Sequence, residues 1–254
     1  MARLIYLSSM TPEEVERFQR SWAGLDAARR REILTRLIDL AEDNVDLDFN
    51  AVFRVCLKDP DEEVREKAIA GIWECEDRSL IDPLVSLLLT DPKERVRVAA
   101  AIALGRFTML AELGKLLPRD GPRLEKALLT VIENRNEPPE VRRRAIEAIA
   151  AFSDLPQVKE IIRETYTSRD VKMQTSALFA MGRNCDRQWL PLLLRTLSSE
   201  EPELRYEAAC ACGELGEEAA VPYLIPLVRD PDPQVQDAAT HALGAIGGAM
   251  AKKV

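Results

Sequence analysis

A short pattern of apolar and small residues recurs six times along the chain. In each copy an apolar anchor is followed by Ala at +4 and, in five copies, by Ala or Gly at +9. With further apolar or small residues at +7 and +8, these positions lie on one face of an α-helix, so each copy predicts an amphipathic helix. The anchors are Val64, Val96, Val141, Met173, Leu204 and Val235. They lie 32, 45, 32, 31 and 31 residues apart, a spacing typical of stacked repeats.

A second apolar stretch separates successive copies, as in residues 80–89 and 221–228. Each repeat is therefore predicted to contain two helices, and the fold class is all-α. Helix starts are expected where a capping residue precedes Pro, at Thr11-Pro12, Asp59-Pro60 and Asp91-Pro92. Four glycines should either end a helix or allow close approach to the next one. They are Gly105, Gly182, Gly213 and Gly244.

The repeats predict a single α-solenoid domain over residues 1–254. Residues 1–58 are expected to form a divergent N-terminal cap and helix pair, with helices near 11–22, 27–40 and 48–57. Residues 59–248 hold the six repeat copies, and residues 249–254 resemble the start of a further helix, truncated or docked. The 45-residue step contains an insert near 106–120 whose leucines are spaced as one helix face. This insert predicts a short extra helix that either covers core or forms a lip over a binding surface.

The copies at residues 96–105 and 204–213, and the helix opening Ala220-Val221-Pro222-Tyr223-Leu224, resemble HEAT repeats. The resemblance covers residues 59–248 and is closest to the short subtype of the phycobilin lyases. It implies a right-handed superhelix of antiparallel helix pairs, of HEAT or armadillo type, in which the second helices line a concave face. It also implies a structural ladder of Asp and Arg six positions apart, as in Asp59/Arg65 and Asp91/Arg97.

Charge and composition restrict the classes of partner. The formal net charge of −8 argues against a general binder of nucleic acid or anionic membrane. Charge is uneven, with −8 in residues 200–250 and +4 in residues 92–126, which favours either a solvated exterior or an oriented protein encounter. No apolar run approaches 18 residues, and the first ten residues do not match a signal peptide. The five cysteines are therefore expected to be reduced thiols of a cytoplasmic, bacterial protein.

Little in the sequence indicates catalysis. His241 is the only histidine, so a cluster of His metal ligands is excluded. The related deoxyhypusine hydroxylases are expected to carry His-Glu pairs where this chain has Tyr206-Glu207, which argues against an iron site. Cys210 and Cys212 should point to opposite sides of their helix. We therefore expect neither an enzyme nor a cofactor or metal.

Among the possible function classes, the sequence favours partner binding. Outward positions of the second helices, at +2, +6 and +9, carry apolar, aromatic or polar residues where water is expected. The candidates are Trp73, Val98, Ile102, Arg143, Phe179, Tyr206, Cys210 and His241. The leading hypothesis is a non-enzymatic scaffold or adaptor for a protein or peptide on the concave face. The alternatives are a phycobilin-lyase-like chaperone that binds a tetrapyrrole or its acceptor, and a HEAT-like nucleic-acid module. The oligomeric state remains open.

Overall fold

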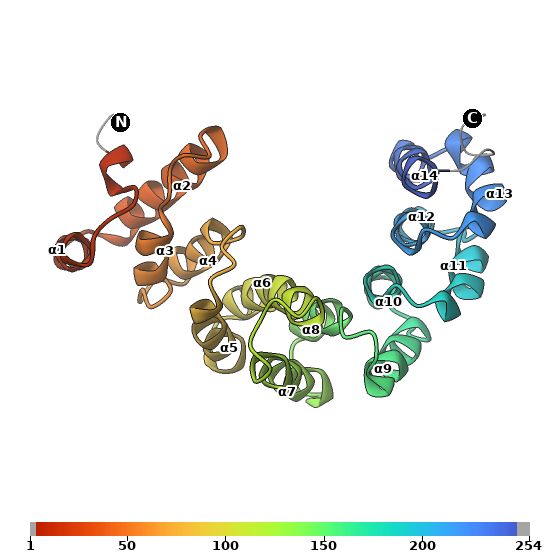
Figure 1. The fold of residues 1–254 in the computed structure, drawn as a ribbon, viewed down its shortest axis with the longest axis horizontal. Coiled ribbons are helices and arrows are strands. Elements are labelled where there is room, and N and C mark those ends of the chain that lie inside the picture. Colours follow the sequence, from red (N-terminus) through yellow and green to blue (C-terminus); the bar gives the residue numbers. More distant parts are fainter. Residues whose placement is uncertain (1–3, 248–254) are drawn as a thin grey trace. The chain divides into compact units, whose positions relative to one another are not determined.

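The computed structural model describes residues 4–247 of the 254-residue chain, so the helix expected over 249–254 lies outside the described residues. The described part is all-α, as predicted, with fourteen α-helices and no strand (Figure 1). The first six are α1 Pro12–Ala23, α2 Ala27–Asp43, α3 Asn50–Cys56, α4 Glu62–Gly71, α5 Ile81–Thr90 and α6 Glu94–Glu112. They are followed by α7 Asp120–Glu133, α8 Pro139–Ile149, α9 Pro156–Tyr166, α10 Val171–Asn184, α11 Leu190–Thr196, α12 Pro202–Leu215, α13 Val221–Leu224 and α14 Pro233–Ile246. Short 3-10 helices cover Leu4–Leu7, Arg78–Leu80, Arg187–Trp189, Glu218–Ala220 and Ile225–Arg229.

The chain forms two compact units, residues 1–107 and 108–254, and the boundary falls within α6. The N-terminal unit contains the predicted cap and divergent helix pair, α1 to α3. Helix α4 packs against both α2 and α3, while α1 packs against α3. Thr11 caps α1 in a full capping box with Glu14, as its sequence predicted. The arrangement of the units as one solenoid domain remains a prediction.

In the C-terminal unit the second helices of successive repeats lie side by side. Helix α10 packs against α8 and α12, and α12 packs against α14. In Figure 1 the first helices α9, α11 and α13 form the other layer of this unit. Five of the six anchors in the whole chain are buried, and only Met173 is half-buried. The period of the sequence therefore identified the core-facing side of each second helix.

Two glycines allow these helices to approach closely. A Cβ on Gly182 would lie 3.0 Å from Cα of Ala211, and one on Gly213 would lie 2.9 Å from Cα of Ala242. The alternative expectation, that the four repeat glycines end helices, is wrong because all four lie inside helices. The ends of α10 and α12 instead use the left-handed residues Cys185 and Gly216.

An Asp–Arg ladder is present, but its carboxylate pairs join successive repeats. Arg65 donates to both carboxylate oxygens of Asp91, at 2.7 and 2.9 Å, and to the backbone carbonyl of Asp59 at 2.8 Å. Arg205 binds Asp230 in the same way, at 2.8 and 2.7 Å. The ladder that the resemblance implies is therefore present at Arg65, which joins the carbonyl of Asp59 to the carboxylate of Asp91 in the next repeat. These arginines are buried and structural.

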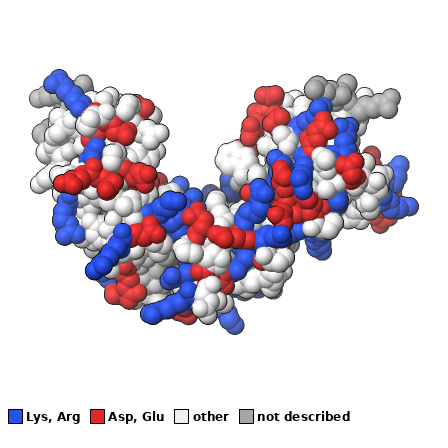
Figure 2. All heavy atoms as spheres, turned by 180° about the vertical axis from the view of Figure 1, so that it is seen from behind, with Lys and Arg blue, Asp and Glu red and all other residues white. Residues whose placement is uncertain are grey.

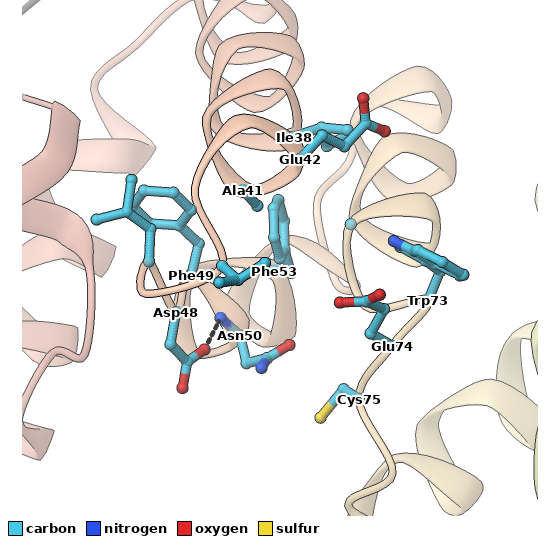
Figure 3. A pocket seen from close by; sticks show the side chains of 13 residues that line it. Ile38, Ala41, Glu42, Asp48, Phe49, Asn50, Phe53, Trp73, Glu74 and Cys75 are labelled. Carbon is cyan, nitrogen blue, oxygen red and sulfur yellow. Dashed lines mark hydrogen bonds between the residues drawn. The ribbon is translucent and has the colours of Figure 1, made fainter.

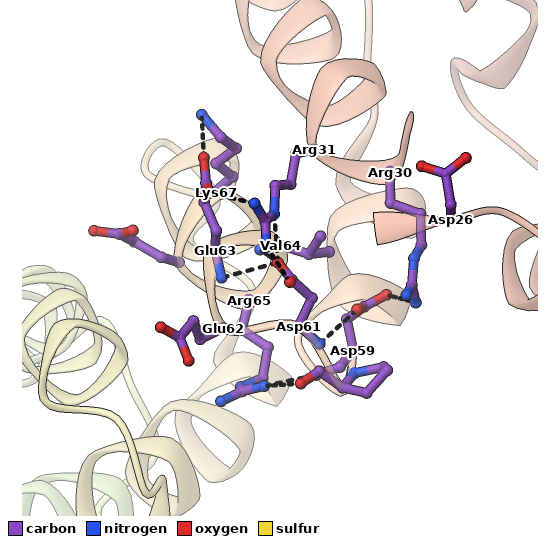
Figure 4. A network of polar contacts seen from close by, with 12 residues as sticks. Asp26, Arg30, Arg31, Asp59, Asp61, Glu62, Glu63, Val64, Arg65 and Lys67 are labelled. Carbon is purple, nitrogen blue, oxygen red and sulfur yellow. Dashed lines mark hydrogen bonds and ion pairs between the residues drawn. The ribbon is translucent and has the colours of Figure 1, made fainter. Parts of the chain in front are cut away.

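Asp59 has a different role from the one its sequence suggested. Figure 4 shows its carboxylate bound to Arg30, and the same oxygen also accepts from the indole N–H of Trp22 at 2.7 Å. Asp61, not Asp59, caps α4 by accepting from the backbone N–H groups of Glu63 and Val64. Arg31 holds the pKa of Asp61 at about 2 through a side-chain hydrogen bond.

The insert does not form a separate helix, so that expectation is wrong. Its first half extends α6 to Glu112, and Gly114, with φ of +67°, ends the helix. The N–H of Lys115 donates to the carbonyl of Leu110, which is the hydrogen bond of a Schellman cap. Leu110 is buried, whereas Leu113 and Leu117 are exposed. The helical spacing of the leucines spans a helix end, because Leu110 and Leu113 precede the capping Gly114 and Leu116 and Leu117 follow it.

Candidate functional site

The structure exposes some predicted binding residues and buries others. Trp73, Ile102 and Tyr206 are 61%, 54% and 39% exposed, and His241 is also exposed. Val98, Phe179 and Cys210 are half-buried. Arg143 stands at an outward position of α8, but its side chain is only 13% exposed because Glu140, Glu147 and Ser176 contact it. Of the eight candidates, Trp73 and Ile102 line a common cavity.

That cavity lies between α4 and α6 and is called here the α4–α6 groove. It has a volume of about 420 Å³. Its lining is mostly apolar and comes from the end of α4, from α5 and from α6. The lining residues are Glu66, Ile69, Ala70, Ile72, Trp73, Cys75, Leu84, Ala99, Ile102, Ala103, Arg106 and Phe107. An indole and an aliphatic side chain, both more than half exposed, therefore flank a preformed apolar groove.

Hydrogen bonds hold the backbone of Trp73 in place just after the end of α4. The helix ends at Gly71, and the backbone N–H groups of Trp73 and Cys75 donate to Ala70 and Ile72. Arg106 donates to the carbonyl of Trp73 at 3.0 Å and forms an ion pair with Glu76 at 2.9 Å. The backbone of Trp73 is thus fixed from α6, while its side chain stays open to solvent.

A second cavity is also lined by Trp73, and we call it the α2–α3 hollow (Figure 3). It measures about 300 Å³. Its lining residues are Ile38, Ala41, Glu42, Val45, Leu47, Asp48, Phe49, Asn50, Phe53, Gly71, Trp73, Glu74 and Cys75. Gly71 is required here, because a Cβ at this position would lie 2.5 Å from the ring of Phe53. In Figure 3 the carboxylate of Glu74 points toward the side where Phe53 lies.

Sequence reasoning missed this hollow. The end of α2 and the following turn diverge from the repeat pattern, so repeat spacing identifies no outward residue in them. One signal was available, since residues 37–53 contain five acids and no base. The other signal was Trp73 itself, which replaces the small residue found at +9 in the other five copies.

The same repeat positions in the C-terminal unit hold a network of ion pairs. Arg143 binds Glu140 at 2.6 Å, Glu147 at 3.2 Å and the hydroxyl of Ser176 at 3.0 Å. Arg144 binds Glu147 as well, at 2.8 Å, and Ser176 donates to Glu147 at 2.6 Å. The polar groups of α8 and α10 are therefore largely satisfied within the chain.

Glu207 of α12 lies beside this network. Burial raises the pKa of its carboxyl to about 7, and the negative charges of Glu147 and Glu214 add to the effect. Arg183 and Arg144 oppose the shift but do not cancel it. Glu207 is therefore partly protonated near neutral pH, which lets three carboxyl groups share one region of the surface.

The aromatic and thiol candidates of this unit face different surroundings. The guanidinium of Arg183 lies 5.3 Å from the ring centre of Phe179 and covers it. Cys212 is fully buried, whereas Cys210 is half-buried. All five cysteines are free, and burial raises the pKa of the Cys212 thiol to about 12. The Cys212 thiol is therefore held in the protonated form.

A further open cavity of about 430 Å³ lies at the edge of α9, α10 and α11, and the sequence had not indicated it. It is lined by Arg163, Tyr166, Thr167, Gln174, Leu192 and Arg195.

Residues 4–247 contain no group of three or more His, Cys, Asp or Glu side chains that could hold a metal ion. None of their helices is both long and apolar enough to cross a membrane. Figure 2 shows acidic and basic side chains interspersed over the visible face of both units.

Comparison with known proteins agrees with this architecture. A family model of HEAT repeats matches residues 50–131 and 158–244. No curated protein sequence matches the chain. The complex of CpcE and CpcF of phycocyanin lyase from Nostoc sp. PCC7120 has a similar structure, with a TM-score of 0.62 and 18% identity over 96% of this chain and 92% of that one. YibA of E. coli has a TM-score of 0.53 and 18% identity over 86% of this chain and 76% of YibA. Kap95p has a TM-score of 0.50 and 16% identity over 88% of this chain and 34% of Kap95p. At these identities the likeness concerns the fold.

Proposed function

Because this chain belongs to the HEAT-repeat family, we propose that it is a non-enzymatic adaptor that binds a protein or peptide partner on its second helices. The α4–α6 groove is the part of this surface that we assign to the contact. Stacked helical repeats present extended surfaces of this kind, and their repeats can vary outward residues without disturbing the core.

A single observation carries the proposal, namely that Trp73 and Ile102 are both more than half exposed and line the same preformed apolar groove. Exposing a large indole to water costs free energy that a partner can recover by covering it. Trp is also among the residues that contribute most to binding energy in protein interfaces. The groove is large enough for one bulky apolar side chain of a partner.

Capture from a host lysate, followed by titration of the purified partner, tests the proposal. Wild type is compared with Trp73→Ala/Ile102→Asp and with the control Tyr223→Ala, since Tyr223 is 52% exposed on a first helix. The purified partner should bind the double variant at least about 30-fold more weakly, the loss expected for an interface hot spot. The control should bind as wild type does. Equal affinity for wild type and the double variant, with helical content retained in both, would reject the groove as the binding site.

The two alternatives remain predictions with weaker support. Likeness to the phycocyanin lyase complex at 18% identity supports the fold and carries no argument about a bilin. A bilin added to the purified protein would have to change its absorption spectrum for that alternative to gain ground. A nucleic-acid role would require salt-sensitive binding of DNA or RNA, which the net charge of −8 opposes.

A further inference from the structure

The chemistry around Trp73 also identifies the kind of segment that the adaptor would take, and this step rests on the proposed function. We propose that the partner supplies a basic amphipathic segment. A large apolar side chain of that segment fills the α4–α6 groove, and a neighbouring Lys or Arg enters the α2–α3 hollow.

Trp73 joins the two cavities. Its side chain and Cys75 line both the groove of about 420 Å³ and the hollow of about 300 Å³. A segment that lies across the indole therefore reaches both at once. The indole N–H of Trp73 has no hydrogen-bond partner among residues 4–247, so the ring is held by its backbone and not by its polar atom.

The two cavities differ in charge. The groove holds one acid and one base, Glu66 and Arg106, whereas the hollow holds three carboxylates and no base. Those carboxylates belong to Glu42, Asp48 and Glu74, and none of them forms an ion pair with a described residue. The hollow also has apolar walls, including Val45, which is 91% exposed.

The nearby arginines are already engaged elsewhere. Arg54 pairs with Asp77 at 2.7 Å and Arg106 pairs with Glu76 at 2.9 Å. Arg95 pairs with Glu66 at the other edge of the groove. The negative charge of the hollow is thus left uncompensated while its surroundings are neutralised in pairs.

Charge complementarity therefore selects a cation for the hollow and an apolar group for the groove. The long aliphatic stem of Lys or Arg suits the hollow, because it can cover the exposed Val45 while its charged end reaches the carboxylates. A cation passing over the exposed face of Trp73 gains further attraction from the ring. An acidic segment would instead meet three like charges.

Short helical peptides test this inference with the 254-residue chain. One peptide is built of Leu and Lys on opposite faces, a second replaces each Lys by Glu, and a third replaces each Leu by Gln. Binding is measured by fluorescence anisotropy of a labelled peptide at low and at moderate salt. The Leu/Lys peptide should bind at least about tenfold more tightly than either counterpart. A few exposed charge pairs together change a dissociation constant by about this factor.

Variants of the chain separate site-specific binding from general attraction. Glu42→Gln/Glu74→Gln should weaken the Leu/Lys peptide about fivefold to tenfold and flatten its salt dependence. Asp48 is left unchanged because it accepts from the backbone of Asn50. The matched control is Glu200→Gln/Glu218→Gln, which removes two exposed acids of the C-terminal unit and should have no effect. Trp73→Ala should abolish binding of the Leu/Lys peptide.

Three outcomes would overturn the inference. The first is equal binding of the Lys and Glu peptides, and the second is an equal loss in the control pair. In the third, sedimentation finds a dimer of the chain that Trp73→Ala dissociates, which would make a second copy the occupant. If the host partner still needs Trp73 and Ile102 in any of these cases, the adaptor function stands and only the charge assignment fails.

Discussion

Equivalent positions of the second helices serve opposite purposes in the two units. On α4 and α6 the outward positions hold Ala70, Ala99 and Ile102, which leave an open apolar groove beside Trp73. On α8 the position equivalent to Ala70 and Ile102 holds Glu147, which binds Arg143 of the same helix and accepts a hydrogen bond from the buried Ser176 of α10. A side chain whose hydrogen bonds are already made within the chain adds little free energy to partner binding. Exposed apolar surface adds much more when a partner covers it. The same repeat can therefore present a binding site in one copy and a self-contained surface in another.

The largest expected effect comes from breaking the network of the C-terminal unit. Arg143→Ala leaves Glu147, whose side chain is 12% exposed, with fewer partners, although Arg144 still binds it. We expect a loss of about 2–3 kcal/mol in the free energy of unfolding, below the full cost of breaking a buried pair. Denaturant unfolding followed by circular dichroism measures it.

The control for this prediction is Arg95→Ala in the N-terminal unit. Its ion pair with Glu66 is exposed, with 47% of the arginine side chain accessible, so a loss under about 1 kcal/mol is expected. If Arg143→Ala were as harmless as the control, the network would not stabilise the unit and the contrast between the two surfaces would fail.

The next effect concerns Glu207 and depends on pH. Its folded-state pKa of about 7 lies above the ordinary value of 4.5, so the folded state binds the proton more tightly than the unfolded chain. The contribution of this group is fully present below about pH 4.5 and is lost as pH rises through 7. Glu207→Gln should therefore raise the stability at pH 8 by about 2 kcal/mol relative to wild type, and much less at pH 5.

Thermal unfolding at both pH values checks this prediction. Glu203→Gln is a matched control on the same helix, since Glu203 is exposed. A gain in stability of equal size at pH 5 and pH 8 would mean that the carboxyl of Glu207 does not titrate between them, and that its burial is unimportant.

The smallest effect concerns the wall of the α2–α3 hollow. Gly71→Ala places a methyl group where the ring of Phe53 now lies, 2.5 Å away, so the ring has to shift. We expect a loss of about 1 kcal/mol in stability, the low end for overpacking, because the hollow offers room for the ring. Weaker binding of the Leu/Lys peptide should accompany it.

Gly216→Ala provides the comparison for Gly71→Ala, since a Cβ there meets no neighbouring atom but strains a φ of +72°. That variant should lose stability by the strain and keep peptide binding. If Gly71→Ala also left peptide binding unchanged, Phe53 would not shape the site.

Much of the fold could be predicted from the chain because it depends on a repeated local pattern. The anchors gave the buried face of each second helix, and the divergent pair at α2 and α3 was recognised near its true bounds. Errors arose where one residue type has two uses. Asp59 and Asp91 looked like helix caps, yet both are buried partners of arginines. Arg143 was placed correctly on an outward helix position, but its neighbours on α8 and α10 cover it.

The sequence by itself determined the period, the all-α class and the exposure of Trp73 and Ile102, because all of these follow from helical spacing within a single repeat. Only the tertiary structure decided which outward residues meet. Whether Arg65 finds Asp59 or Asp91, and whether Glu42 and Glu74 line one hollow, depends on how one helix pair packs on the next. Side-chain partners from different repeats are set by that packing, since residues about 30 positions apart share no local spacing rule.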